Sequence, residues 1–412
     1  MTFSVTDCAS RQLTRAKIDP TALYVLRHLY EAGHTAYLVG GCVRDMLLDR
    51  TPKDFDVATS ARPAQVRHLF RNSRVVGRRF RLVHVYSGTK IIEVSTFRRA
   101  PDPELTAYLC EDEFVTEDGI VLDNTFGTSQ EDARRRDFTI NGLFYECFSR
   151  NVIDYVGGLE DIEKRLIRTI GDPCRRFIED PVRMLRAVKF CVKLGFTMEE
   201  STWQALLKNH ACIKMASLPR LQEELMRMLE IGHSSEMIQL LLTSGLLADL
   251  VPNITKYLQH SYGEGGFYGH RGKMFKRLLD LSDTMKLGQT YARSCRFTAL
   301  LLPMFINGWQ THRNDEEDWI CRLVEPLAAC FGLSRQMQDE VQEYFAYLRC
   351  MLGSGGEQAL KARKLHNLAT FTYAFMFFGL LYQVGAVEEE RFLYWQDWYE
   401  EKRKSLRQSK VM

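Results

Sequence analysis

The sequence predicts an α+β protein in which an N-terminal unit of mixed strands and helices precedes a chain that is helical to its end. Up to about residue 150, short apolar strand patterns alternate with short helix patterns, which is typical of a mixed sheet covered by helices. From residue 158 onward, apolar residues recur at helical spacing and few alternating patterns follow. The composition, with 45% hydrophobic and 26% charged residues, is that of a globular protein.

Length, charge and cysteine content narrow the class of protein. A chain of 412 residues is long enough for about two to four structural units. The net charge of +3 indicates no particular partner. Eleven cysteines occur without a CxxC pair, which indicates reduced thiols in a cytoplasmic protein and argues against a zinc knuckle. The first twenty residues carry charges and lack the apolar run of a signal peptide.

Residues 368–387 are long and apolar enough to resemble a membrane span. These twenty residues carry no formal charge, and that length crosses a bilayer. A glutamine, two threonines and two glycines interrupt the stretch, and charged helix-like segments surround it. We therefore expect a buried core helix and no stable membrane insertion, with a membrane-associated helix as the alternative.

The N-terminal unit can be read element by element. The patterns predict strands at 35–39, 55–58, 82–86 and 91–97, and helices at 42–48 and 63–70. Between residues 100 and 133 the chain carries ten acids and no lysine or arginine. We interpret this acidic stretch as a solvated loop, with a lid over an active site as the alternative. Beyond it, helical spacing is clearest at 162–167, 182–194, 201–208 and 218–229.

Asp54 and Asp56 are the residues whose chemistry is easiest to derive. In a strand, residues two apart point to the same face, so the two carboxylates are expected side by side, with Phe55 buried opposite. Such oxygen ligands suit Mg²⁺, which proteins bind through one or two carboxylates together with substrate phosphates. Taken alone, a pair of this kind is more often a surface turn or an ion-paired site.

The surroundings of the two aspartates change that interpretation. Gly40 and Gly41 stand between a predicted strand and a predicted helix, where bare backbone N–H groups and the helix dipole attract phosphate. Arg44 lies one turn into the helix, within reach of a triphosphate. A glycine pair alone is more often a tight turn, but the combination predicts nucleotidyl transfer. In that reaction two metal ions activate the attacking hydroxyl and stabilise the leaving pyrophosphate.

The string LVGGCVRDMLLDRTPKDFDVAT at residues 38–59 resembles the catalytic head of one branch of the polymerase-β superfamily. That branch contains the bacterial poly(A) polymerases and the class II tRNA CCA-adding enzymes. The resemblance continues through RRRDFTIN, DYVGGLED and EDPVRMLR, which begin at residues 134, 154 and 179. It covers about residues 36–230, and the remainder matches only in helical character.

The resemblance implies a domain organisation. Residues 1–157 would form the polymerase-β-like nucleotidyltransferase head, with a mixed sheet and helices. Residues 158–230 would form a helical neck with a base-reading helix, 231–310 a helical body, and 311–412 a helical tail that binds RNA. Residues 154–161 would be the flexible connection between head and neck.

The resemblance also implies roles for residues of the head. The phosphates of the nucleotide would be held by Gly40, Gly41 and Arg44, and Mg²⁺ by Asp54 and Asp56. Asp137 matches a catalytic carboxylate, with Arg136 beside it on the nucleotide. Glu93, on a strand of its own, competes for the place of third carboxylate, and we rank it behind Asp137.

The residue spacing within the segment EDPVRMLR indicates a base-reading role. On a helix, Asp180 and Arg183 are three residues apart and share a face. An acid and an arginine together offer acceptors and donors to the edge of a base, and in the resembling family such a pair replaces a template. Arg186, one turn further, would contact the nucleotide. An ordinary intrahelical ion pair is the alternative interpretation.

Residues 75–85 distinguish the two activities within the branch. Their sequence, VVGRRFRLVHV, matches the two aliphatics and Gly-Arg-Arg-Phe that mark bacterial poly(A) polymerases. Residues 62–99 hold ten lysines or arginines against one acid, a density that suits the phosphate backbone of RNA. Arg78, Arg79 and Arg81 are therefore candidate RNA contacts, with a solvated basic face as the alternative.

Together these features predict a polynucleotide adenylyltransferase. It would add AMP from ATP to RNA 3′ ends without a template, with Mg²⁺ as cofactor, in cytoplasmic RNA processing and decay. A tRNA CCA-adding nucleotidyltransferase is the alternative. A catalytically inactive RNA-binding scaffold is a third hypothesis, and the intact carboxylates argue against it. The sequence names no protein partner.

Overall fold

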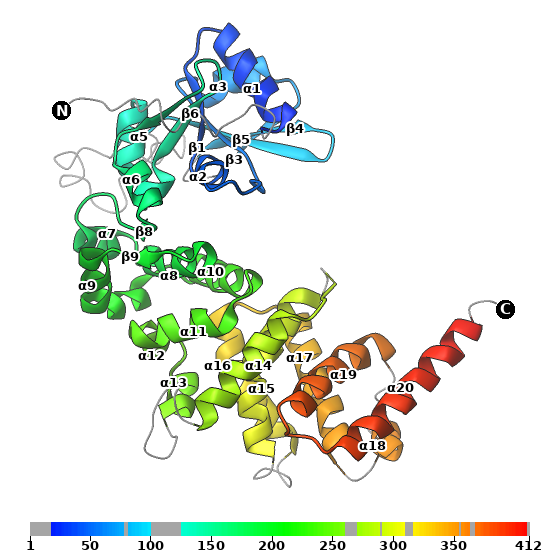
Figure 1. Ribbon diagram of the computed structural model, residues 1–412. Helices are drawn as coiled ribbons and strands as arrows, with labels where there is room; N and C mark the ends of the chain where they lie inside the picture. Colours follow the sequence, from blue (N-terminus) through cyan, green and yellow to red (C-terminus); the bar gives the residue numbers. More distant parts are fainter. Residues whose placement is uncertain are drawn as a thin grey trace, which may run out of the picture. The chain divides into compact units, whose positions relative to one another are not determined.

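The computed structural model describes residues 18–77, 81–99, 125–259, 270–288, 291–309, 316–353, 356–362 and 367–409. The chain divides into two compact units. The first unit contains Met1–Arg176 and Gly195–Ala205, and the second contains Phe177–Leu194 and Leu206–Met412. Figure 1 labels their elements in chain order.

A mixed seven-stranded sheet forms the centre of the first unit, in the order β3-β4-β5-β2-β1-β6-β7. Only the central pair β2 and β5 runs parallel, and the other neighbours are antiparallel. The strands are β1 Ala36–Val39, β2 Asp56–Thr59, β3 Ser73–Val76, β4 Leu82–Ser87, β5 Lys90–Thr96, β6 Leu143–Glu146 and β7 Asn151–Asp154.

The two faces of the sheet bury different clusters because side chains alternate along each strand. Leu38 and Val57 belong to a large core that also contains residues of α1, α2 and α3. Their neighbours Val39 and Ala58 belong to a smaller cluster that includes Ala133 of α5. The helices of this unit are α1 Pro20–Glu31, α2 Gly41–Leu47, α3 Pro63–Leu69, α5 Ser129–Arg135, the 3₁₀ turn η4 Thr139–Asn141, and α6 Gly158–Glu163.

Local chemistry explains where two of these helices begin. Asp19 precedes α1, and its side chain accepts the Thr21 backbone N–H at 2.7 Å, while a proline occupies the first turn. Thr128 and Glu131 form a reciprocal capping box at the start of α5. Both helices then present short apolar residues to the sheet.

The structure confirms the predicted strands β1, β2, β4 and β5 and the helices α2 and α3, within a residue or two at each end. Patterning did not predict β3, α5, β6 or β7. The strands β3 and β7 are the two edges of the sheet and have four residues each, too short for a clear alternation. Residues 100–124, most of the acidic stretch, lie outside the described residues.

One predicted helix is wrong. Residues 162–167 do not form a helix, because α6 ends at Glu163 and Arg165 takes a positive φ of 55°, a conformation that no right-handed helix contains. Leu166–Ile167 forms β8, which pairs in parallel with β9 Thr197–Met198.

Residues 154–161, the predicted flexible connection between head and neck, lie within the first unit. The Asp154 carboxylate accepts the backbone N–H groups of Val156, Gly157 and Leu159, each at 2.9 Å. The buried Asp161 accepts the Thr139 hydroxyl at 2.6 Å and the Arg168 guanidinium. The division into head, neck, body and tail stays a prediction.

The described residues of the second unit contain helices and no strand. Its elements are α8 Val182–Leu194, η5 His210–Met215, α10 Leu218–Glu230, α11 Ser234–Thr243, α12 Leu246–Leu250, α13 Pro252–Gln259, α14 His270–Asp283, α15 Ala292–Trp309, α16 Glu316–Phe331, α17 Arg335–Leu352, α18 Gly356–Ala362, α19 Leu368–Gln383 and α20 Glu389–Ser409. Helices α7 Pro173–Glu179 and α9 Glu200–Asn209 each contribute residues to both units.

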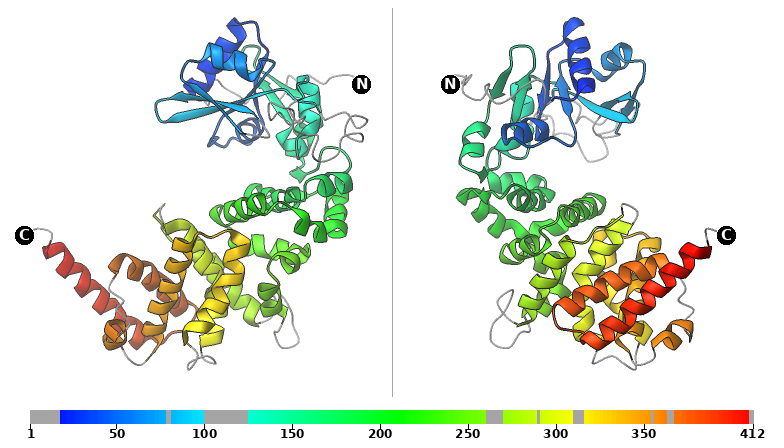
Figure 2. Two further views of the ribbon diagram at one scale, coloured as in Figure 1. Left: turned by 180° about the vertical axis from the view of Figure 1, so that it is seen from behind. Right: turned by 45° about the vertical axis from the view of Figure 1, so that its right-hand side comes forward.

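Helix α19 confirms the prediction of a buried core helix at 368–387. It packs against α17, α14 and α20 (Figures 1 and 2). Phe371, Ala374, Phe377 and Leu381 are each at most 1% exposed. Among the described residues, no helix has the length and apolar character needed to cross a membrane.

Gly158 offers a test of how tightly the first unit is packed. A Cβ at this position would overlap the Thr139 carbonyl oxygen. We predict that Gly158→Ala lowers the free energy of unfolding by about 1–3 kcal/mol, the usual cost of overpacking. Urea denaturation measures this change. Gly379→Ala in α19 is the control, because its added Cβ would meet the nearest ring atom at 3.8 Å; equal stability of the two variants would contradict the packing.

Candidate active site

Asp54 and Asp56 lie at the start of the central strand β2. Asp56 is its first residue, and Asp54 is exposed just before it. Phe55 packs against the large core that contains Val57, so Asp56 faces the opposite side, as predicted from the alternation. The charge of Asp54 contributes to raising the pKa of Asp56, so the two carboxylates interact electrostatically.

Glu93 stands beside Asp56 on the neighbouring parallel strand. Their Cα atoms are direct partners in the register of β2 and β5, so their side chains share a face. The Glu93 side chain is 51% exposed, and its Oε1 lies 3.5 Å from the His84 Nε2. The strand pairing thus brings a third carboxylate to the start of β2.

The neighbouring carboxylates change the pKa of Asp56. Burial and the neighbouring charge of Glu93 raise the pKa of Asp56 to about 6, with Asp54 adding to the effect, while the Arg136 guanidinium opposes it. Negative charge is therefore in excess at Asp56 when only the protein's own groups are present. A divalent cation would relieve this excess.

Gly40 forms a sharp turn between β1 and α2. Its φ of +72° lies in the left-handed region that favours glycine. A Cβ on Gly40 would come 3.1 Å from the Arg136 Nη1, so the guanidinium lies directly against this turn. A Cβ on Gly41, the first residue of the seven-residue helix α2, would lie 3.6 Å from the Arg44 Nη2, so a second guanidinium also borders the turn.

Arg136 is held in place from several sides. Its Nη2 donates to the Asp132 Oδ2 at 3.0 Å, and its guanidinium carbon lies 5.2 Å from the centre of the Phe144 ring. Arg176 donates to its backbone carbonyl at 2.5 Å. The cation is therefore fixed beside both the Gly40 turn and Asp56.

Arg44 has different surroundings from those predicted. Its side chain is 3% exposed, and it donates to the Asn141 Oδ1 at 2.6 Å and to the Asp45 Oδ1 at 2.6 Å. A guanidinium so enclosed braces α2 against η4. Direct contact between Arg44 and a phosphate stays a prediction, and the contacts described here support a positioning role.

Asp137 belongs to the same network as Arg44. Its Oδ1 accepts the Phe138 backbone N–H at 2.8 Å and the Asn141 Nδ2 at 3.0 Å. Asn141 therefore connects Arg44 to Asp137. Glu93 is paired in register with Asp56, and the ranking of Asp137 ahead of Glu93 as the third carboxylate stays a prediction.

The carboxylates fit a metal that completes its ligand set from the substrate. Among the described residues, no group of three His, Cys, Asp or Glu side chains is already arranged as a metal site. Asp54, Asp56 and Glu93 nevertheless offer hard oxygen atoms at one point of the sheet, and Mg²⁺ is commonly bound by one or two carboxylates plus phosphates. Arg136 and the Gly40 turn lie beside them for such phosphates.

Asp180 and Arg183 lie at the start of α8, in the second unit. Asp180 lies two residues before the first residue of the helix, and the Arg183 Nε is 4.0 Å from its Oδ2. Arg220 of α10 donates to the same Oδ2 at 2.7 Å. The Asp180 Oδ1 is buried and has no hydrogen-bond partner among the described residues, so it is an acceptor that a ligand can use.

Arg186 lies further along α8 and also contacts α10. Its Nη1 is 4.0 Å from the Glu224 Oε2, and its guanidinium carbon lies 5.5 Å from the centre of the Phe190 ring. Glu224 is buried and also pairs with Lys189. Two residues of α10, Arg220 and Glu224, thus hold the two ends of the predicted base-reading segment.

Sequence reasoning missed Arg220 and Glu224, although one signal was present. Glu224 falls in the apolar stripe of α10 with Leu221, Leu225 and Met228, at spacings of three, one and four residues. A charged residue in such a stripe requires a partner. Of the candidate RNA contacts, Arg81 is exposed, while Arg78 and Arg79 lie outside the described residues.

Comparison with known proteins agrees with this geometry. Residues 36–168 match the family model of the poly A polymerase head domain. Residues 195–258 match the model described as the probable RNA- and SrmB-binding site of polymerase A. The solved CCA-adding enzyme of Bacillus stearothermophilus, in complex with CTP, is 26% identical with a TM-score of 0.63, covering 94% of this chain and 82% of that one.

Curated relatives match the same part of the chain. The poly(A) polymerase I of Escherichia coli is 46% identical over 246 residues, which are 60% of this chain and 52% of that protein. The CCA-adding enzyme of Bacillus subtilis is 38% identical over 234 residues, which are 57% of this chain and 56% of that protein. The matches thus span about half the length of these relatives.

The fold and the carboxylates of β2 define the class of the first unit as a nucleotidyltransferase head. Over residues 36–168 and 195–258, the chain is similar to the family that contains the bacterial poly(A) polymerases and the CCA-adding enzymes. The resemblance predicted from the motifs is confirmed.

The raised pKa of Asp56 leads to a prediction about stability. Because its folded-state pKa of about 6 exceeds the ordinary value of 3.8, its contribution to stability is fully present below about pH 4 and is lost as the pH rises through 6. We expect Asp56→Asn, which stays neutral, to raise the free energy of unfolding of the metal-free protein at pH 7.5 by about 1–2 kcal/mol.

Thermal unfolding in EDTA and in Mg²⁺ measures this effect. The advantage of Asp56→Asn should shrink toward pH 4.5, and Mg²⁺ should stabilise the wild type more than the variant. Glu163→Gln, at the exposed end of α6, is the control. A variant that is less stable than the wild type at pH 7.5 and responds equally to Mg²⁺ would remove Asp56 from the metal site.

Proposed function

We propose that this chain is a template-independent polynucleotide adenylyltransferase, which adds AMP from ATP to RNA 3′ ends with Mg²⁺. The observation that carries the proposal is the pairing of Asp56 with Glu93 across β2 and β5, with Asp54 beside them and Arg136 against the Gly40 turn. Nucleotidyl transfer needs oxygen ligands for a metal next to an anion-binding turn, and this part of the sheet offers both.

The roles of the head residues follow from their surroundings. Asp54, Asp56 and Glu93 would hold Mg²⁺, which when bound neutralises phosphate charge and activates the attacking hydroxyl. Gly40 lets the backbone approach the triphosphate, and Arg136, oriented by Asp132, binds its charge. Arg44 and Asn141 keep the turn and η4 in fixed positions. Positioning of this kind is the protein's main contribution to phosphoryl transfer.

Base choice is proposed to rest on Asp180 and Arg183. The unpartnered Asp180 Oδ1 can accept from an exocyclic amino group, and the Arg183 guanidinium can donate to a ring nitrogen. On their Watson–Crick edges, adenine and cytosine both present an amino group beside an acceptor nitrogen, whereas the ring nitrogen on that edge of guanine is protonated and uracil has no amino group. The pair therefore separates ATP and CTP from GTP and UTP, and other groups must separate ATP from CTP.

The acceptor is proposed to be RNA. The second family model matched by the chain describes a probable RNA-binding site, and the CCA-adding enzyme of Thermotoga maritima, which shares the fold, was solved with tRNA. RNA and ATP are both present in the cytoplasm, where we place this reaction as a step of mRNA processing. Exposed Arg81, next to the Gly-Arg-Arg-Phe sequence, supports backbone contact.

Addition of CCA to tRNA is the second candidate function. The CCA-adding enzymes are 38% identical to the chain over their matched parts, against 46% for the poly(A) polymerase I of Escherichia coli. The solved neighbours include CCA-adding enzymes. We place poly(A) addition first because of this difference and because of the sequence at residues 75–85.

One assay separates the two functions. The purified chain is incubated with Mg²⁺, a tRNA that lacks its CCA end or an unstructured RNA, and each NTP singly or mixed. A poly(A) polymerase extends the unstructured RNA into long tails with ATP alone and uses CTP poorly. Arrest after three nucleotides on the tRNA, with a requirement for CTP, would instead establish CCA addition. Asp54→Ala and Asp56→Ala should nearly abolish either reaction and keep RNA binding; a loss below about tenfold, or ~1.4 kcal/mol of barrier, would contradict the metal assignment.

Base discrimination gives a further prediction. Arg183→Ala should lower the preference for ATP over GTP and UTP, and Arg220→Ala should do the same by about tenfold because Asp180 loses its 2.7 Å partner. The measurement is kcat/KM for each of the four nucleotides. Arg227→Ala is the matched control, since this exposed arginine lies on the same helix and pairs with Glu223. An equal loss for all four nucleotides would mean that Arg220 only stabilises the fold.

A further inference from the structure

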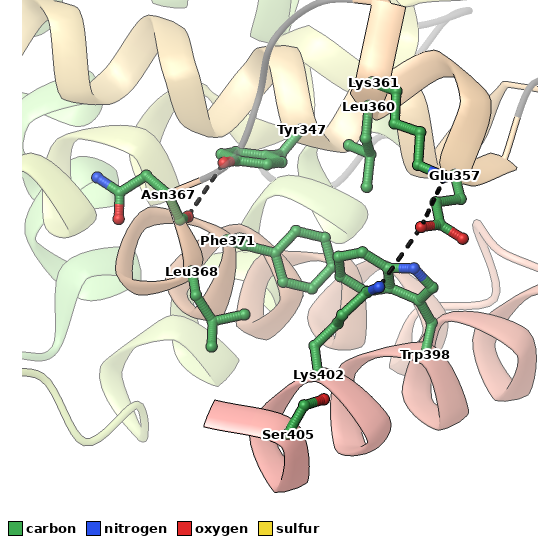
Figure 3. Close-up of a pocket in the computed structure, with 10 residues that line it drawn as sticks. All are labelled: Tyr347, Glu357, Leu360, Lys361, Asn367, Leu368, Phe371, Trp398, Lys402 and Ser405. Carbon is green, nitrogen blue, oxygen red and sulfur yellow. Dashed lines mark hydrogen bonds and ion pairs between the residues drawn. The ribbon is translucent and has the colours of Figure 1, made fainter. Parts of the chain in front are cut away.

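A cavity of about 390 Å³ lies among α17, α18, α19 and α20 of the second unit (Figure 3). Three aromatic side chains from three different helices line it: Tyr347, Phe371 and Trp398. Lys361, Lys402 and Ser405 line its polar part. No role described above involves this cavity, and its volume lies in the range of small-ligand sites.

The aromatic wall is ordered by packing and hydrogen bonding. The ring centres of Phe371 and Trp398 are 4.8 Å apart, and those of Phe371 and Tyr347 are 5.3 Å apart at nearly right angles. The Tyr347 hydroxyl donates to the Asn367 carbonyl oxygen at 3.0 Å. The Trp398 indole N–H is buried and has no acceptor among the described residues, although a buried indole N–H usually has one.

The polar side of the cavity carries positive charge. Lys361 and Lys402 share one carboxylate, that of Glu357, at 3.3 and 3.5 Å. The Lys402 ammonium lies 5.5 Å from the centre of the Trp398 ring. Arg403 and Lys404 follow on the same helix and are exposed, so cations continue along α20 beyond the cavity.

We propose that this cavity binds one nucleotide of single-stranded RNA. The base would contact the ring of Trp398, which Phe371 supports from behind, and the indole N–H would donate to an acceptor on the base. Lys361 and Lys402 would bind the flanking phosphates. Stacking platforms next to cationic tracks are how proteins hold single strands without reading their sequence. The continuation of the cations along α20 fits a phosphodiester chain better than a free nucleotide.

The proposal rests on the proposed function, since the strand held here is the RNA that is being extended. A second contact, separate from the transferase head, would keep the RNA bound between additions. The proposal predicts that this contact increases the length of the tail added in each binding event and does not change which nucleotide is added.

Four variants test the cavity. Ser405→Phe fills it without removing any aromatic packing, because Ser405 is exposed on α20, and Trp398→Ala removes the stacking surface. Leu393→Ala and Tyr394→Ala are matched controls on the same helix, since both side chains are exposed and neither lines the cavity. We expect about tenfold weaker binding of a labelled oligo(A) to the first two variants, the effect of losing one stacked base. Both controls should keep wild-type RNA affinity and nucleotide addition.

Each outcome of the oligo(A) titration decides the proposal. Unchanged affinity in Ser405→Phe overturns it, and this variant decides alone if Trp398→Ala does not fold. Tight binding of free AMP that Ser405→Phe abolishes would overturn the choice of an RNA strand in favour of a free nucleotide. If the wild type adds no nucleotide while Ser405→Phe still weakens RNA binding, the proposed function fails and the cavity assignment stands.

Discussion

The excess of negative charge at the start of β2 is the constraint around which the first unit is built. Burial and the charges of Glu93 and Asp54 raise the pKa of Asp56 to about 6, and among the described residues the Arg136 guanidinium opposes them. Such an arrangement destabilises the isolated fold above that pH. The arrangement becomes favourable when a divalent cation and nucleotide phosphates bind. Charges that are already in position before the ligand arrives increase the affinity of a binding site.

The alternation of the sheet separates stability from chemistry. Val57 and Val94 point into the large core with α1 and α3, and Asp56 and Glu93 point to the other face. On that side, hydrogen bonds accompany the smaller apolar cluster. Arg44, Asn141 and Asp137 form one connected set, and Gly158 packs directly against Thr139 in the turn that carries them. Loss of a hydrogen bond within this set would therefore displace the residues on the catalytic face of the sheet and leave the large apolar core packed.

The sequence predicted those features that depend on local spacing. The two-residue period of a strand predicted that Asp54 and Asp56 share a face, and the helical period of about four residues predicted α8. The glycine pair predicted the turn at Gly40. The features it missed depend on contacts between distant segments. No pattern of neighbouring residues shows that β5 pairs with β2 in the register that places Glu93 beside Asp56. The sequence therefore ranked Asp137, which lies inside a dense motif, first as the third carboxylate. The hydrogen bond from Arg44 to Asn141 likewise joins residues that are 97 positions apart, so no local pattern could predict it.

Two buried polar atoms of the second unit share a property that links base choice to RNA retention. The Asp180 Oδ1 and the Trp398 Nε1 lack hydrogen-bond partners among the described residues, and each lies beside cations that carry other bonds. An unpaired buried acceptor or donor costs about 1–3 kcal/mol, a cost that a ligand removes when it supplies the missing partner. At Asp180 the missing partner is a donor, which fits an amino group of the incoming base. At Trp398 the missing partner is an acceptor next to aromatic faces, which fits a base that is already part of the RNA strand. An unpaired buried polar atom would thus serve nucleotide selection at Asp180 and RNA retention at Trp398.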